Sequence, residues 1–233
     1  GKITRGFVPQ RDVVYFDGAL TDIWHHWQEN GITFDAILVG YLGSLAAVKA
    51  AGEIIDRLLA PGGVAIVDPA MADNGKLYSG FDEDYVRAIG SLAGKADIIL
   101  PNVTEAAILS GLPYQENIDR NYVNQLLNGL NHPCAVLTGV DFDEDSTGIV
   151  LQEGTVQHEY RHKRIGTGCH GTGDIFAAVF TGALMQGKNR LDAAKIAADF
   201  TCRCIKNTVN APAHWYGVKF EPLLPELMEM LGR

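Results

Sequence analysis

Nine residues in the C-terminal third of the sequence have the composition of a phosphate-binding loop. Residues 166–174 read Gly-Thr-Gly-Cys-His-Gly-Thr-Gly-Asp, and apolar residues then recur at helical spacing as far as Leu184. Glycines let backbone N–H groups approach an anion closely, and a helix start adds unbonded N–H donors and the positive end of a dipole. Asp174 could then accept the proton of an attacking hydroxyl while these donors stabilise a transferring phosphoryl group. The alternative for Asp174 is structural, as an acid that only complements the helix dipole.

Two better-known glycine motifs do not account for this segment. Gly166, Gly168 and Gly171 match the G-x-G-x-x-G pattern, but a dinucleotide-binding fingerprint follows an apolar strand within a strand–helix–strand unit. Here the preceding residues 161–164 are Arg-His-Lys-Arg, and two predicted helices follow with no strand between them. No G-x-x-x-x-G-K-[ST] motif occurs either. We therefore expect phosphate to bind at residues 166–174 themselves.

A second chemical signal is Pro101-Asn-Val-Thr-Glu105, at the end of a predicted strand. Asn102 and Glu105 are three residues apart at a strand-to-helix turn, so both can face one cleft. Glu105 could hold water on Mg²⁺, and Asn102 could reach a phosphate oxygen. The alternative is local: Thr104 caps the helix and Glu105 merely lies in its first turn.

A third signal begins where another buried strand ends, at Asp68. Residues 68–73 read Asp-Pro-Ala-Met-Ala-Asp, and Tyr78 follows. A carboxylate at the end of a buried strand is costly unless it has a partner. Asp68 therefore either binds a cation or caps a turn. Thr138 ends a further strand and offers a hydroxyl group near the same cleft.

The elements that must position these residues alternate along the chain. Apolar runs predict strands at 34–39, 64–67, 97–100 and 135–138, and Gly154 marks a hairpin between 147–151 and 155–160. Capped or periodic segments predict helices at 44–59, 82–92, 104–111, 118–130, 172–187, 190–208 and 222–232. This order predicts a single α/β domain over 1–233, with a mostly parallel sheet covered by helices on both faces. Ligands bind outside the carboxyl ends of such strands, where Tyr41, Asp68, Asn102, Glu105 and Thr138 lie.

The bulk composition narrows the function further. The 233 residues carry a formal charge of −9 and are 47% hydrophobic, which is typical of a globular protein and unfavourable for general nucleic-acid binding. The longest apolar runs are too short to cross a bilayer, and no signal-peptide pattern is present, so we expect a cytoplasmic protein away from membranes. The four cysteines lack zinc spacing, and His25 and His26 beside Trp24 and Trp27 are typical of a helix surface and core.

Taken in order, these motifs resemble the ribokinase-like superfamily and, within it, the pyridoxal kinases. The similar stretches are D-P-A-M-A-D at 68–73 with Tyr78, L-P-N-V-T-E-A-A-I-L-S-G at 100–111, L-T-G at 137–139 and G-T-G-D at 171–174. G-T-G-D and N-x-x-E are general to the superfamily, whereas the D-P-A-M-A-D stretch with Tyr78 and the E-A-A-I-L-S-G stretch are more specific to vitamin B6 kinases. The resemblance covers about two-thirds of the chain. It implies a three-layer sandwich and transfer of phosphate from MgATP to the 5′-hydroxymethyl group of pyridoxal, pyridoxamine or pyridoxine.

The resemblance also implies a role for each matching residue. It makes Asp174 the catalytic base, Gly171, Thr172 and Gly173 the anion hole, and Tyr41 the aromatic residue packed on the pyridine ring. ATP contacts would come from Asn102, Thr138, Gly168, Gly171, Gly173 and Tyr78. Asp68, Glu105 and Asp73 would surround Mg²⁺ and a monovalent cation, K⁺ or Na⁺. Such enzymes are typically homodimers.

One departure bears on this expectation. Pyridoxal kinases begin with a strand and a helix that contribute a serine and other ring contacts, and the sequence Gly1-Lys2-Ile3 starts after that region. We therefore expect either that this N-terminal element is absent or that it precedes the residues of this sequence. Two alternatives stay open: a hydroxymethylpyrimidine kinase, which shares the G-T-G-D motif, and a catalytically inactive B6-binding paralogue. A sugar kinase is disfavoured by the lack of an Asn/Asp-rich sugar-binding stretch.

Overall fold

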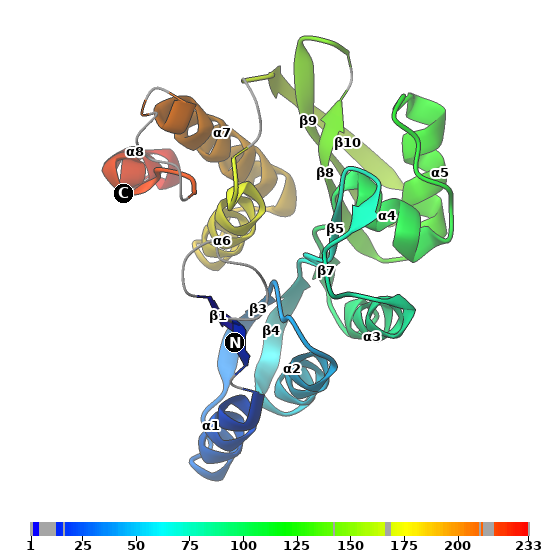
Figure 1. Cartoon of the computed structure of the whole chain (residues 1–233). Coiled ribbons are helices and arrows are strands. Elements are labelled where there is room, and N and C mark those ends of the chain that lie inside the picture. Colours follow the sequence, from blue (N-terminus) through cyan, green and yellow to red (C-terminus); the bar gives the residue numbers. More distant parts are fainter. Residues whose placement is uncertain are drawn as a thin grey trace. The chain divides into compact units, whose positions relative to one another are not determined.

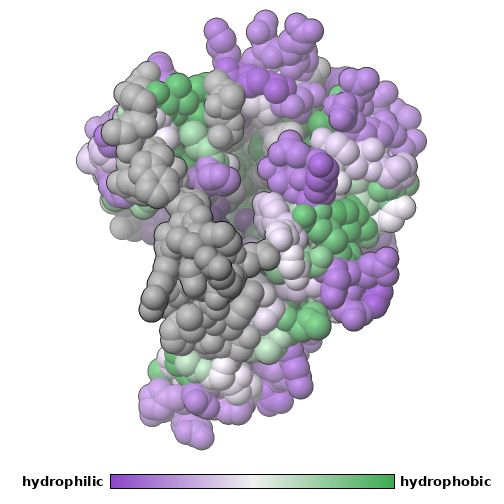
Figure 2. Space-filling view, in the orientation of Figure 1, coloured by the Kyte–Doolittle hydropathy of each residue, from purple (hydrophilic) through white to green (hydrophobic). Residues whose placement is uncertain are grey.

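A computed structural model of the chain describes residues 2–4, 13–15, 17–141, 143–165, 169–209, 211 and 217–232. Its backbone contacts divide the chain into two compact units, residues 1–99 and residues 100–233 (Figure 1). Hydrophilic side chains make up much of the face seen in Figure 2, with smaller apolar patches between them. Within the described ranges, no helix is both long and apolar enough to span a bilayer.

The first unit is built around three parallel strands. Its elements are β1 (Lys2–Thr4), β2 (Val13–Tyr15), α1 (Asp17–Glu29), β3 (Phe34–Val39), α2 (Leu45–Leu58), β4 (Leu59–Val67), β5 (Ala72–Asp73), β6 (Lys76–Leu77), α3 (Glu83–Ala93) and β7 (Ile98–Ile99). Strand β4 pairs in parallel with β3 and with β7, while β1–β2 and β5–β6 are short antiparallel pairs. The end of β4 is apolar and fully buried at Ala65, Ile66 and Val67, which explains why it lies between two neighbours.

Local capping fixes the helices of this unit. The Ser44 hydroxyl accepts a hydrogen bond from Ala47 N–H at 3.1 Å, and the Asp82 carboxylate accepts one from Tyr85 N–H at 2.9 Å. These bonds confirm the predicted helices that start at 44 and 82. The predicted strand start at Val64 is wrong, because β4 begins at Leu59 and its pairing with β3 is irregular near Phe34. Gly63 is required there: a Cβ would lie about 3.0 Å from the Asp35 carbonyl oxygen.

The second unit combines an antiparallel meander with helices. Its elements are α4 (Val103–Ser110), α5 (Arg120–Leu130), β8 (Cys134–Asp141), β9 (Ser146–Glu153), β10 (Val156–Lys163), α6 (Thr172–Met185), α7 (Arg190–Val209), η2 (Glu221–Leu223) and α8 (Leu224–Leu231). Strands β8, β9 and β10 pair in that order, and the β9–β10 turn at Gly154 (φ +58°) confirms the predicted hairpin. Helix α7 packs against β9, β10 and α6, as Figure 1 shows for the two helices.

Candidate active site

The end of the glycine-rich segment, Gly171–Asp174, forms the start of α6, as predicted. Gly171 is the residue before the helix, with φ +84°, a left-handed conformation that favours glycine. Because glycine has no side chain, it makes no side-chain cap to the first turn. Thr172 is half-buried, whereas Gly173 and Asp174 are exposed. The backbone donors at this helix start can therefore meet an anion from outside the protein.

Asp174 lies beside that helix start. It is the acidic residue of the first turn, and its Oδ2 would lie 3.9 Å from a Cβ placed on Gly171. The Asp174 carboxylate and the backbone N–H groups of the first turn of α6 therefore lie side by side at an exposed helix start. Gly168, predicted to contact ATP, falls outside the described residues, as do Gly166 and Thr167.

A second group of predicted residues meets where α4 begins beside β8. Asn102 Oδ1 accepts from Glu105 N–H at 2.9 Å, and Glu105 Oε2 accepts from Asn102 N–H at 3.0 Å, which is a complete capping box. The prediction that Thr104 caps this helix is wrong, because the cap is Asn102. Glu105 is only 1% exposed, so its carboxylate is buried at a helix start.

Thr138 lies next to this capping box. Its N–H donates to the Pro101 carbonyl at 2.9 Å, and its hydroxyl donates to the same oxygen at 3.4 Å. Asn102 and Thr138 also form a parallel bridge. The structure thus brings together Asn102, Glu105 and Thr138, which the sequence predicted to share one end of the sheet.

In the first unit, the predicted residues gather after β3 and β4. Asp68 N–H donates to the Val39 carbonyl at 2.8 Å, which places the start of the 68–73 segment beside the end of β3. Asp68 Oδ1 accepts from Ala70 N–H at 3.2 Å, and Ala70 has φ +40°, which is uncommon for a residue with a Cβ. Asp68 therefore caps a turn, which is one of the two roles predicted for it. Its side chain is nearly buried, since the residue is 9% exposed. Asp73 is exposed and accepts from Asn74 N–H and Nδ2–H, at 2.9 and 3.0 Å.

An aromatic cluster joins the two predicted tyrosines of this unit. The Phe81 ring lies 5.5 Å from the Tyr41 ring and 6.5 Å from the Tyr78 ring, and it stacks on Tyr85 at 3.8 Å. Tyr41 and Tyr78 are 38% and 40% exposed, so each offers a ring face to a ligand. Phe81 is not among the residues predicted from the sequence, although its position directly before the Asp82 cap was a signal that could have found it.

Asp68, Asp73 and Glu105 provide carboxylate oxygens, which Mg²⁺ prefers as ligands. Asp68 and Glu105 are nearly buried. Among the residues that the structure describes, no three His, Cys, Asp or Glu side chains cluster closely enough to hold a metal ion. A magnesium ion bound through one or two carboxylates plus substrate phosphate oxygens fits such a donor set. Asp68, directly after β4 in the first unit, and Glu105, in the first turn of α4 in the second unit, are nearly buried carboxylates of this kind.

The thiols have structural surroundings. All four cysteines are free, and Cys202 Sγ lies 2.9 Å from His162 Nδ1. Burial raises the pKa of Cys202 to about 12 and that of Cys204 to about 11, with nearby carboxylates adding to the effect. These two thiols are therefore protonated at neutral pH. Cys169, in the glycine-rich segment, is half-buried.

The α/β elements have the ribokinase-like fold, a mostly parallel central sheet flanked by helices, which similar solved structures share. The family model described as phosphomethylpyrimidine kinase matches residues 27–218, and the chain belongs to that family. Among solved structures, pyridoxal kinase from Lactobacillus plantarum is 31% identical with a TM-score of 0.85, over 98% of this chain and 82% of that one. A Bacteroides thetaiotaomicron protein solved with pyridoxal is 27% identical with the same TM-score of 0.85, over 100% and 82%.

Curated relatives carry both kinds of name. The pyridoxal kinase of Dictyostelium discoideum is 25% identical over 70% of this chain, and the hydroxymethylpyrimidine/phosphomethylpyrimidine kinase of Bacillus subtilis is 28% identical over 75%. The chain covers 59% and 65% of the length of these two relatives. Membership of the kinase family is therefore shown, while relatives with either substrate name have similar identity to the chain, 25% and 28% in these two cases.

Proposed function

We propose that the chain transfers a phosphoryl group from ATP to the 5′-hydroxymethyl group of a vitamin B6 compound: pyridoxal, pyridoxamine or pyridoxine. The observation that carries the proposal is the start of α6, where exposed Asp174 stands beside the uncapped first turn at Gly171. A hydroxymethyl group is a weak nucleophile until a base accepts its proton. Phosphoryl transfer otherwise depends on positioning and on stabilising charge at the phosphoryl oxygens.

In this proposal each predicted residue has one task. Asp174 Oδ accepts the hydroxyl proton, and the backbone N–H groups of Gly171, Thr172 and Gly173 donate to the transferring phosphoryl group. The Asn102 amide and the Thr138 hydroxyl contact ATP phosphates. The adjacency of Asn102 and Thr138, through their parallel bridge, supports a shared task for these two residues.

The remaining residues would hold the metal ion and the flat ring. Asp68 and Glu105 would bind Mg²⁺ directly or through water, with Asp73 nearby, and the ion would neutralise phosphate charge when bound. Tyr41 would pack on the pyridine ring, and Tyr78 would cover the nucleotide. A K⁺ or Na⁺ ion beside Mg²⁺, a homodimer, a cytoplasmic location and a single kinase domain over 1–233 complete the proposal.

The test of the base is Asp174→Asn, with Asp192→Asn as a matched control. Both residues are third in their helices, α6 and α7, and both stand in the first turn, so both substitutions remove one charge from a helix start. We expect Asp174→Asn to lower kcat by about 10²–10⁴ with little change in nucleotide affinity. Asp192→Asn should retain kcat within about twofold, since a helix-dipole contribution affects stability by about 0.3–1 kcal/mol. Nearly full turnover by Asp174→Asn would refute the assignment.

The second candidate is phosphorylation of hydroxymethylpyrimidine, which the family description and the Bacillus subtilis relative favour. Both substrates are flat heteroaromatic alcohols, so Tyr41 and Asp174 could serve either. Parallel turnover assays with pyridoxal and with hydroxymethylpyrimidine separate the two functions by their kcat/KM ratio. A chain that binds pyridoxal but consumes no ATP with either alcohol would instead be a B6-binding paralogue.

A further inference from the structure

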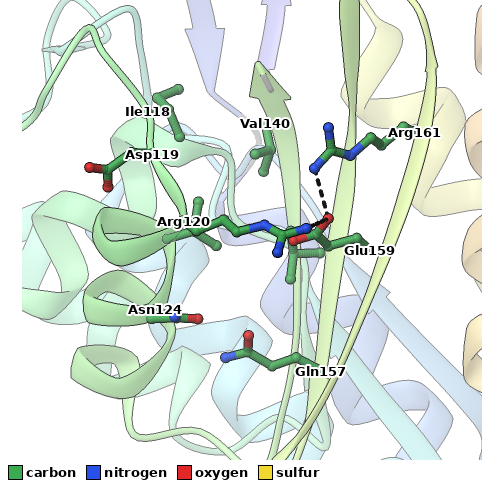
Figure 3. Close-up of a pocket in the computed structure, with 10 residues that line it drawn as sticks. Ile118, Asp119, Arg120, Asn124, Val140, Gln157, Glu159 and Arg161 are labelled. Atoms are coloured by element: carbon green, nitrogen blue, oxygen red, sulfur yellow. Dashed lines mark hydrogen bonds and ion pairs between the residues drawn. The ribbon is translucent and has the colours of Figure 1, made fainter. Parts of the chain in front are cut away.

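A pocket of about 430 Å³ lies between α5 and the β8–β10 meander of the second unit (Figure 3). This volume falls within the range that metabolite-sized ligands occupy. None of the residues assigned to phosphoryl transfer is among those that line it. The lining residues are Ile118, Asp119, Arg120, Val123, Asn124, Val140, Val150, Gln157, Glu159 and Arg161.

One face of β10 presents polar side chains to the pocket. Side chains alternate along a strand, so Gln157, Glu159 and Arg161 share the face that lines the pocket. The opposite face is used by α7: the Tyr160 hydroxyl donates to Asp199 at 2.7 Å, and His162 contacts Cys202.

Two arginines from different elements meet in this pocket. Arg120 Nη2, at the start of α5, donates to Glu159 Oε2 at 3.1 Å, and Arg161 Nη2 donates to the same oxygen at 2.9 Å. Figure 3 shows both guanidinium groups directed at that one carboxylate. Partial burial raises the pKa of Glu159, but the hydrogen bonds and charges of Arg161 and Arg120 outweigh it, so the pKa is lowered overall. The three charged side chains together carry a charge of +1.

The fourth charged lining residue does not cancel this charge locally. Asp119 Oδ1 accepts from Tyr122 N–H at 2.7 Å, which caps α5. Figure 3 shows its carboxylate directed away from the arginine pair. The ion pairs are also easily rearranged: the Arg120, Arg161 and Glu159 side chains are 76%, 41% and 30% exposed, and exposed pairs contribute only about 0–1 kcal/mol. An incoming anion can therefore replace Glu159 at small cost.

The rest of the pocket suits an organic group attached to that anion. Val123, Val140 and Val150 are 6%, 0% and 2% exposed and supply an apolar floor. Asn124 and Gln157 are directed toward each other across the lower part of the pocket (Figure 3). Gln157 Nε2 donates to Gln152 Oε1 at 2.7 Å, which fixes the orientation of its amide. The pocket thus combines cationic, apolar and amide surfaces.

We propose that this pocket is a second, non-catalytic binding site for a small organic phosphate. Arg120 and Arg161 would bind the phosphate in place of Glu159, and the valine floor would contact the organic group. Two guanidinium groups converging from separate elements suit a phosphate, which presents oxygens in several directions, whereas one guanidinium fork already satisfies a carboxylate. Glu159 acts as the internal counter-ion of the empty site.

The test is calorimetric titration of the full chain with phenyl phosphate, in the presence of a saturating non-hydrolysable ATP analogue and Mg²⁺. The analogue keeps the probe from the α6 helix start. We expect saturable binding below about 10 mM, and a loss of affinity of tenfold or more in the double variant Arg120→Ala/Arg161→Ala. Glu159→Gln should bind several-fold more tightly, because it retains the shape of the side chain and removes the competing charge.

Arg190→Ala is the matched control. Arg190 is a half-buried arginine of this unit, it forms an ion pair with Glu153 on the same meander, and it does not line the pocket. The affinity of the Arg190→Ala variant for phenyl phosphate should stay within about twofold of that of the unmodified chain. Absence of saturable binding, equal binding by the double arginine variant, or no gain in Glu159→Gln would each overturn the proposal. Benzoate that binds as tightly as phenyl phosphate would overturn the assignment to phosphate.

Discussion

Glu105 has both a structural and a proposed chemical role, and paired substitutions can separate them. Its carboxylate is 1% exposed and accepts the Asn102 N–H at 3.0 Å. Gln keeps an acceptor oxygen at the same place and is itself a capping-box residue. The free energy of unfolding should therefore change by less than about 1 kcal/mol in Glu105→Gln, which is the size of a helix-dipole contribution.

Glu105→Ala should be much more damaging to stability. It removes the acceptor, leaves the part-buried Asn102 N–H without that bond, and creates a cavity where a buried side chain lay. Loss of a buried hydrogen-bond partner costs about 1–3 kcal/mol, and the cavity adds to it. We expect a loss of about 2–4 kcal/mol for Ala against less than about 1 kcal/mol for Gln.

Catalysis, unlike stability, should be impaired strongly by Glu105→Gln. If the Glu105 carboxylate helps to hold Mg²⁺, the amide in Glu105→Gln is a weaker ligand although the fold is intact. We expect kcat/KM for ATP at limiting Mg²⁺ to fall at least tenfold and to recover partly as Mg²⁺ is raised. Asp82→Asn, at the cap of α3, is the control for loss of a cap charge and should leave the Mg²⁺ dependence unchanged.

Urea denaturation and Mg²⁺-titrated turnover on the same protein samples provide the two readouts. Equal destabilisation by Gln and Ala would show that the negative charge itself supports the fold. A Gln variant with unaltered Mg²⁺ dependence would refute the proposed role of Glu105 at the metal ion and leave only its capping role.

Three further predictions concern residues of the first unit, and the first of them uses helix α6 for its control substitution. Ala70→Gly should leave the free energy of unfolding unchanged or raise it by up to about 1 kcal/mol, since φ is +40° at Ala70. The control, Ala178→Gly in the exposed middle of α6, should lower it by about 1 kcal/mol. Equal losses of stability in urea denaturation would contradict this prediction. Burial raises the pKa of Tyr85 to about 12, so its contribution to stability is present below pH 10 and lost as the pH rises through 12. Tyr85→Phe should flatten the loss of stability between pH 10 and 12, and an unchanged alkaline limb would count against it. Phe81→Leu should raise KM for pyridoxal by about 3–10-fold and leave kcat nearly unchanged, because the Tyr41–Phe81 ring pair contributes about 0.5–1.5 kcal/mol. A fall in kcat alone would exclude a role of Phe81 in positioning Tyr41.

Elements with a strong local signal could be predicted from the sequence. The run Phe34–Val39 forms β3 with the predicted bounds, and Ser44 caps α2 as expected. The hairpin around Gly154 was also predicted, because a glycine that can adopt a positive φ between two strand-like runs is typical of a tight turn. In each case propensity, capping and burial favour the same structure.

The mistakes have physical causes. The second strand was predicted to start at residue 64, but Pro61-Gly62-Gly63 also lies inside β4, where a close approach of Gly63 to the Asp35 carbonyl requires glycine. Thr104 and Asn102 are both good capping residues, and the spacing to Glu105 decides between them, since only Asn102 has Glu three positions later. The two-residue strands β5 and β6 are too short for an alternating pattern. The pocket beside α5 combines residues of four elements, α5, β8, β9 and β10, and has no local signal.

Functional assignment is difficult at these positions because the same atoms can build the local fold and contact a substrate. Asp68 holds the strained turn at Ala70, and Asn102 and Glu105 cap α4, so an alanine variant of any of them would lose activity whether or not it touches ATP. Asp174 differs, because no side-chain cap precedes it and its carboxylate is exposed. Asp→Asn and Glu→Gln changes preserve acceptor geometry and alter only charge. A catalytic or metal-binding carboxylate should therefore lose turnover while stability is retained, whereas a purely structural one should lose neither.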